Sequence, residues 1–332
     1  MGTIQRDDHR IEGRDGMTLA VRRVWALGAT SAATPLILVH GARAGGVASF
    51  DVPVEGGSLA ADLAGAGYDV FVMDARGYGG SSRPPEMEQP ATASAPLVRS
   101  VDVVRDLDAV VDWVRAVTGE ERVSLLGWAT GGHWAGFYAS LHPDQVKQLI
   151  IFNTLYGSTF DHPSLGRGSG MEDAANPGRF DRAGTGGWRS SAAASLLRTW
   201  DNSIPEGELD RWRDPAVAAA YARAAIEAAT GDPDATAFPH PTGALEDSFY
   251  LATGRQLWDA SFVRAHTLVI RSERDFWSRP EDVERLAEQL IDAASVRTVT
   301  LLNATHFAHL DRPEYGRRQF LDEVLSFLAE TA

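Results

Sequence analysis

The chain has 332 residues, of which 44% are apolar and 23% are charged. This is the composition of an ordinary globular protein, which excludes a disordered or fibrous chain. The formal net charge is −14, and Lys147 is the only lysine among basic residues that are otherwise arginine. An acidic surface without a basic cluster repels phosphate backbones and anionic lipid heads, so we expect neither nucleic acid nor a membrane as a partner.

Cysteine is absent, which excludes disulfides, thiolate metal ligands and a cysteine nucleophile. Residues 1–16 are charged and lack the apolar segment of a signal peptide, and no apolar run approaches the roughly 18 residues of a membrane-spanning helix. These features predict a cytoplasmic protein. Nothing in the sequence indicates its oligomeric state.

Short apolar runs alternate with amphipathic helical patterns in both terminal parts of the chain. In chain order, the patterns predict a strand at 18–26, a turn at 28–35, a strand at 35–41, a helix at 58–67, a strand at 68–77, a helix at 103–119, a strand at 122–129, a helix at 130–143 and a strand at 146–154. Later in the chain they predict a strand at 266–275, a helix at 280–294, a strand at 296–305 and a helix at 314–330. Strands that alternate with helices predict an α/β fold with a mainly parallel, doubly wound sheet.

The interval 155–262 differs in composition from the rest of the chain. It holds many glycine and proline breakers around an alanine-rich helical stretch at 214–229, and it contains four tryptophans. An interval of this length is too long for a plain loop in a compact domain. We therefore predict a mostly helical cap at 155–262, inserted between the two parts of one core, 1–154 and 263–332.

Chemically useful residues follow the predicted strands. In parallel sheets, ligands bind beyond the carboxyl ends of the strands. The residues at these ends are the segments 40–43, 74–84 and 127–132, followed by Asp275 and His306. Within the second segment, we interpret Asp74 as a structural residue that pairs with Arg76.

The segment GWATGG at 127–132 has the form of a sharp turn from a strand to a helix. Gly127 and Gly131 stand two residues on either side of Ala129, where a chain that folds back on itself has room only for small residues. Gly132 eases the start of the helix. The N-terminus of that helix offers free N–H groups and the positive end of its dipole. The turn is therefore built to hold an oxyanion.

The combination of motifs resembles the α/β-hydrolase superfamily. It consists of H-G at 40–41, D-x-R-G-x-G-x-S-x-x-P at 74–84, the turn at 127–132, and a late aspartate followed by a histidine. The resemblance covers most of residues 15–155 and 263–330. It implies a capped serine esterase or lactonase with alanine at the nucleophile position, Ala129. It also implies that the backbone N–H groups of Ala42 and Thr130 bind the oxyanion.

The resemblance also implies the general base and the acid that orients it. His306, in NATHFAHLDRP, takes the position of the base, and His309 is the competing histidine three residues later. Asn153, after an earlier strand, cannot hold the negative charge that favours an imidazolium. Of Glu273 and Asp275, we expect Asp275 to be the acid, because its spacing from the strand matches the superfamily.

Alanine at position 129 has no lone pair with which to attack a carbonyl. Three explanations are open: an engineered serine-to-alanine change that traps the substrate, a natural non-catalytic small-molecule binder, and a cofactor-free enzyme that uses His306 and Asp275 in the manner of dioxygenases of this fold. A strained turn costs on the order of 1–3 kcal/mol. Its retention together with His306 and Asp275 favours the first explanation, with a carboxylic ester or lactone as substrate.

Substrate contacts are expected from aromatic residues near the site. Trp128 and Trp277 neighbour the turn and Asp275, and Arg43 and Tyr156 are further candidates; together they predict a bulky, largely apolar small-molecule substrate. His133, one helical turn after the nucleophile position, is a candidate for the pocket lining. The sequence has no phosphate-cradling motif and no cluster of metal ligands in a suitable context, so we expect no cofactor and no metal.

Overall fold

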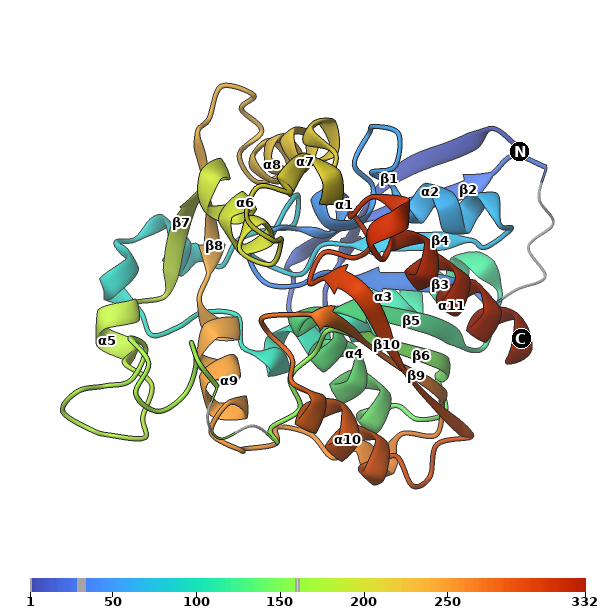
Figure 1. The fold of residues 1–332 in the computed structure, drawn as a ribbon. Helices are drawn as coiled ribbons and strands as arrows, with labels where there is room; N and C mark the ends of the chain where they lie inside the picture. Colours follow the sequence, from blue (N-terminus) through green and yellow to red (C-terminus); the bar gives the residue numbers. More distant parts are fainter. Residues whose placement is uncertain (1, 29–33, 159, 161) are drawn as a thin grey trace.

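The computed structural model describes residues 2–28, 34–158, 160 and 162–332. The turn predicted at 28–35 falls mostly outside these described residues. Within them, one eight-stranded sheet has the order β1-β2-β4-β3-β5-β6-β9-β10 (Figure 1). β1 and β4 each run antiparallel to β2, and the remaining neighbours are parallel. The prediction of a mainly parallel sheet is confirmed.

Apart from β1, each strand of this sheet overlaps a predicted strand. Their bounds are β1 Ile4–Glu12, β2 Thr18–Ala26, β3 Leu36–Val39, β4 Val70–Met73, β5 Val123–Trp128, β6 Val146–Phe152, β9 His266–Arg274 and β10 Ser295–Thr305. The helices outside the cap are α1 Gly46–Phe50, α2 Leu59–Gly65, α3 Ser100–Thr118, α4 Thr130–Leu141, α10 Pro280–Gln289 and α11 Arg317–Glu330, with short 3-10 turns η1 Pro85–Glu88, η2 Ala91–Ala93 and η4 Pro313–Tyr315.

Helices cover both faces of the sheet (Figure 1). Alternate residues of a strand point to opposite faces, and in β3 Leu36 and Leu38 join one apolar cluster whereas Ile37 and Val39 join another. The first cluster contains buried residues of α1, α2 and α11, and the second contains those of α3, α4 and α10. The sheet is therefore doubly wound, as predicted, and its central strands β3, β4, β5 and β6 are almost fully buried on both faces for this reason.

Strand β1 was not predicted from the sequence. Its segment IQRDDHRIE is rich in charge, and most of its side chains are at least partly exposed. It pairs with β2 in register from Ile4 opposite Ala26 to Glu12 opposite Thr18. As an edge strand it gains its backbone hydrogen bonds from β2 alone, so it needs little apolar patterning.

In the described part of the chain between β6 and β9, helices make up most of the regular secondary structure, and a small antiparallel sheet of two strands, which was not predicted, accompanies them. Figure 1 shows this part on one side of the main sheet, with α6, α7 and α8 close together. Its elements are α5 Arg182–Thr185, β7 Trp188–Ala192, α6 Ala193–Asp201, α7 Leu209–Trp212, α8 Pro215–Thr230, β8 Ala237–Pro241, α9 Gly243–Leu251 and η3 Ala260–Phe262. The exact cap boundaries, 155 and 262, stay a prediction.

Candidate active site

The turn between β5 and α4 holds Ala129 in an unusual backbone conformation, with φ 52° and ψ −119°. The glycines around it are required sterically. A Cβ on Gly127 would lie 2.3 Å from the carbonyl oxygen of Gly131, and a Cβ on Gly131 would lie 2.1 Å from that of Val39. A Cβ on Gly132 would lie 2.1 Å from the hydroxyl of Thr154. The chain therefore folds back so tightly at this turn that only glycine fits.

The loop after β3 lies directly against this turn. A Cβ on Gly41 would lie 3.3 Å from the Cβ of Ala129. The backbone N–H groups of Ala42 and Thr130 donate to no acceptor in the described part of the chain. Thr130 is the first residue of α4, where N–H groups have no intrahelical partner. Two unsatisfied amide donors thus lie on the two segments that meet at Ala129.

Asp275 and His306 form a buried pair beyond the ends of β9 and β10. The Nδ1 of His306 lies 2.6 Å from Oδ1 of Asp275, and both side chains are almost fully buried. The carboxylate also accepts from the backbone N–H of Trp277 at 3.0 Å, from that of Ser278 at 2.8 Å, and from the Ser278 hydroxyl. When Nδ1 donates to Asp275, Nε2 is the ring nitrogen left to take up a proton.

The environment of Asp275 keeps its carboxyl ionised. Burial raises the pKa of this group, but the charge and hydrogen bond of His306, with the donors from Ser278 and Trp277, outweigh burial and hold the pKa below its ordinary value. Hydrogen bonds donated to a carboxylate favour its charged form. The pair is therefore set to stabilise a proton on the imidazole.

The backbone of His306 is fixed by the side chains of Trp128, the last residue of β5, and Asn153, directly after β6. Its carbonyl oxygen accepts from Nε1 of Trp128 at 3.0 Å and from Nδ2 of Asn153 at 3.1 Å. Asn153 also accepts from the backbone N–H of Ser272 at 2.7 Å. From the sequence, Asn153 was considered only for the position of the acid that orients His306. Its positioning contact was missed, because no local pattern of residues reveals it.

A cavity of about 210 Å³ lies over Ala129 and His306. The predicted residues Ala42, Thr130, Arg43, Trp128 and Trp277 also line it. Gly41, from the H-G motif at 40–41, also lines the cavity, and the lining residues that sequence reasoning did not identify are Leu196, Thr199, Tyr221, Leu245, Phe276 and Phe307. Two of these directly follow Asp275 and His306 in the sequence and could have been found from that adjacency, whereas those of the cap have no such signal.

Tyr156 does not line this cavity, contrary to the expectation from the sequence. Its ring is buried in the cluster beneath the opposite face of the sheet, where its hydroxyl lies 2.6 Å from the Gln289 amide and accepts from the N–H of Ala260. His133 is also absent from the lining. Its Nδ1 accepts from Nε1 of Trp258 at 3.1 Å, and burial lowers its pKa to about 4. Both residues are structural.

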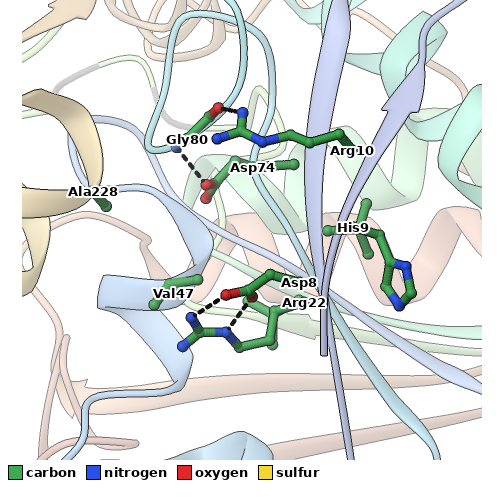
Figure 2. A pocket seen from close by; sticks show the side chains of 11 residues that line it. Asp8, His9, Arg10, Arg22, Val47, Asp74, Gly80 and Ala228 are labelled. Carbon is green, nitrogen blue, oxygen red and sulfur yellow. Dashed lines mark hydrogen bonds and ion pairs between the residues drawn. The ribbon is translucent and has the colours of Figure 1, made fainter. Parts of the chain in front are cut away.

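Asp74 is structural, as predicted, but its partner is not Arg76. Its carboxylate accepts from the backbone N–H groups of Gly46 at 2.5 Å and Gly80 at 2.8 Å. Figure 2 shows Asp74 directed at Gly80 in a separate cavity, with Arg10 donating to the Gly80 carbonyl. Arg76 instead donates to the carboxylates of two other residues, Asp15 at 2.7 Å and Asp106 at 2.6 Å.

In the described part of the chain, no group of three or more histidine, cysteine or acidic side chains is arranged to hold a metal ion. None of its helices combines the length and apolar character needed to cross a membrane.

Comparison with known proteins identifies the family. The alpha/beta hydrolase fold family matches residues 34–313, so the chain belongs to the α/β-hydrolase fold family. No curated protein matches the sequence. Among solved structures, the thioesterase domain from the curacin biosynthetic pathway has a TM-score of 0.61 and 16% identity, covering 98% of this chain and 99% of that one.

Two further solved structures are similar over nearly their whole length. A serine-to-alanine mutant of a meta-cleavage product hydrolase from Pseudomonas fluorescens IP01, complexed with acetates, has a TM-score of 0.63 and 15% identity, covering 98% of each chain. The esterase RhEst1 from Rhodococcus sp. ECU1013 has a TM-score of 0.61 and 17% identity, covering 98% of this chain and 99% of that one. At these identities the likeness shows the fold alone.

Proposed function

We propose that this fold carries a serine hydrolase for a carboxylic ester or lactone of a bulky, largely apolar small molecule. In this chain, alanine replaces the nucleophilic serine at position 129, so that substrate is bound but not cleaved. The observation that carries the proposal is that Ala129, in its strained turn, lines one cavity with His306 of the buried Asp275–His306 pair.

In the proposed reaction, a serine at position 129 attacks the carbonyl carbon while Nε2 of His306 takes its proton. Asp275 stabilises the resulting imidazolium, and the N–H groups of Ala42 and Thr130 bind the oxyanion. His306 then returns the proton to the leaving alcohol, and an acyl-enzyme forms. A water molecule, deprotonated by His306, attacks the acyl carbon and releases the carboxylic acid.

Alanine at position 129 removes the nucleophile but leaves the rest of this arrangement in place. Loss of the nucleophile of a serine protease lowers turnover by about a million-fold. A non-Gly residue in a sparsely populated conformation costs on the order of 1–3 kcal/mol, and the methyl group of Ala129 can make no hydrogen bond to offset that cost. The strained conformation at position 129 is the one that a nucleophile in such a turn requires. Its presence in a chain with alanine there supports the replacement of a serine by Ala129. One fold neighbour, the meta-cleavage product hydrolase mutant, carries the same kind of substitution.

The test is the Ala129→Ser variant, assayed on a panel of p-nitrophenyl esters and lactones. We expect measurable hydrolysis by Ala129→Ser, none by the unmodified chain, and none when His306→Ala is combined with Ala129→Ser. The proposal fails if Ala129→Ser is folded and inactive on the whole panel. In that case, tight ligand binding would favour a non-catalytic binder, and oxygen consumption by the unmodified chain would favour a cofactor-free enzyme based on His306 and Asp275.

A further inference from the structure

Arg43 places a cation in the cavity over Ala129. The residue follows Ala42 in the loop after β3 and has a φ of 85°, a left-handed conformation that is uncommon for residues other than glycine. Its side chain is partly buried and lines the same cavity as His306. The backbone thus adopts an unfavourable conformation at the residue that brings a guanidinium to the site.

The contacts of Arg43 come from two serine hydroxyls of the cap. Its Nη2 donates to Oγ of Ser195 at 2.7 Å and to Oγ of Ser191 at 3.3 Å. Ser195 donates its own proton to the carbonyl of Ala192 at 2.8 Å. Ser191 lies 2.9 Å from Nε2 of His240.

The state of His240 decides the direction of that last hydrogen bond. Burial, assisted by the charge of Arg43, lowers the pKa of His240 to about 4. The ring is therefore neutral near pH 7, and its Nδ1 lies 3.3 Å from the Pro241 carbonyl, to which only an N–H can donate. Nε2 is then the acceptor for Ser191. Both serines give their protons away and present lone pairs to Arg43, which orients the guanidinium without neutralising it.

Among the described residues, no acidic side chain pairs with this cation. The lining of the cavity contains neither aspartate nor glutamate, and within the described residues Arg43 has no carboxylate partner among its hydrogen bonds. An arginine stays protonated even when partly buried. A cation held in a mostly apolar cavity without a counter-charge is costly. The missing negative charge is therefore one that a ligand can supply.

We propose that Arg43 binds a carboxylate of the substrate. The inference rests on the proposed function and narrows its substrate class to an ester or lactone that carries a carboxylate on an otherwise apolar body. The Nε and Nη1 groups of Arg43 donate to no described residue, so they remain for a charge-assisted hydrogen bond. Arg43 directly follows Ala42, whose N–H is a proposed oxyanion donor, so the carboxylate lies near the reacting carbonyl.

The first experiment measures binding to the chain as it exists, which does not consume the ligand. Isothermal titration calorimetry compares 4-phenylbutyrate with the neutral 4-phenylbutyramide. We expect the carboxylate to bind about 10- to 100-fold more tightly, the range for hydrogen bonds to a charged group. Arg43→Gln removes this preference, and Arg43→Lys retains part of it.

The control for general charge effects is Arg83→Gln. Arg83 donates to the carbonyl of Ala229 and does not line this cavity, so its loss leaves the ratio of the two affinities unchanged. Carboxylate bound only by the amides of Ala42 and Thr130 would keep its preference in Arg43→Gln. Equal affinities in the unmodified chain, or a preference that persists in a folded Arg43→Gln variant, overturn the inference.

The second experiment separates this inference from the proposed function. In Ala129→Ser, kcat/KM is measured for mono-p-nitrophenyl glutarate and for p-nitrophenyl valerate. Hydrolysis of both esters without a preference for the glutarate overturns the Arg43 assignment and leaves the serine hydrolase standing. A preference for 4-phenylbutyrate in binding, without any ester hydrolysis, overturns the hydrolase and leaves the carboxylate site standing.

Discussion

The Asp275→Asn substitution tests the role proposed for the buried carboxylate. Oδ1 accepts from His306 and from the N–H of Trp277, and Oδ2 accepts from the N–H and hydroxyl of Ser278. Asparagine keeps one oxygen and places an NH₂ group on the other side. In one orientation of the asparagine, the NH₂ group faces the N–H of Ser278. In the other it donates to Nδ1 of His306 and forces the ring into the tautomer that carries its proton on Nε2.

Both stability and activity should fall. In either orientation, the NH₂ group leaves at least one buried N–H unpaired and removes the charge from the hydrogen bonds that remain. Hydrogen bonds to charged groups contribute about 1.5–3 kcal/mol each, so we expect a loss of about 2–4 kcal/mol in the free energy of unfolding. In the Ala129→Ser background, a wrong tautomer should lower kcat by about 10⁴-fold.

Urea unfolding and hydrolysis of a p-nitrophenyl ester measure the two effects. The control is Glu273→Gln, since Glu273 is exposed and, within the described residues, accepts a hydrogen bond from the N–H of Asn303 alone, at 2.8 Å. We expect it to keep activity within about 3-fold, because its carboxylate contacts neither His306 nor the cavity. The reasoning is refuted if Asp275→Asn retains activity within about 10-fold of its parent, or if Glu273→Gln loses as much as Asp275→Asn.

Three other predictions concern the scaffold. Gly131→Ala should cost about 2–3 kcal/mol in urea unfolding, because its Cβ would lie 2.1 Å from the rigid carbonyl of Val39; an unchanged midpoint would contradict this. Burial lowers the pKa of His133 from 6.5 to about 4, so as the pH falls the unfolded chain takes up this proton before the folded chain does. About 3 kcal/mol of the free energy of unfolding, fully present above pH 6.5, should therefore be lost as the pH falls to 4. In urea unfolding at several pH values, His133→Gln should reduce this dependence of stability on pH. Tyr156→Phe should cost about 1–2 kcal/mol, because it leaves the N–H of Ala260 unpaired, and its affinity for 4-phenylbutyrate should not change.

Local patterns in the sequence determined most of the scaffold and the centre of the site. Short runs rich in apolar and β-branched residues predicted seven strands of the main sheet, and the runs are most continuous in the central strands, because a strand buried on both faces has no polar side. The glycines around Ala129 and the order of Asp275 and His306 could be recognised in the sequence, because the steric limits of a tight turn and the end of a strand each depend on only a few neighbouring residues. The same locality explains why β1 was missed, since an edge strand pairs through its backbone and carries no apolar signature.

Only the tertiary structure decided which distant side chains meet. Arg43 donates to Ser191 and Ser195, which lie 148 and 152 residues further along the chain, and Asn153, directly after β6, donates to the carbonyl of His306, which follows β10. Tyr156, near the end of β6, lies under the opposite face of the sheet because the chain after that strand turns away from the cavity. Such contacts depend on how separate segments pack together, and no short pattern of residues records that packing.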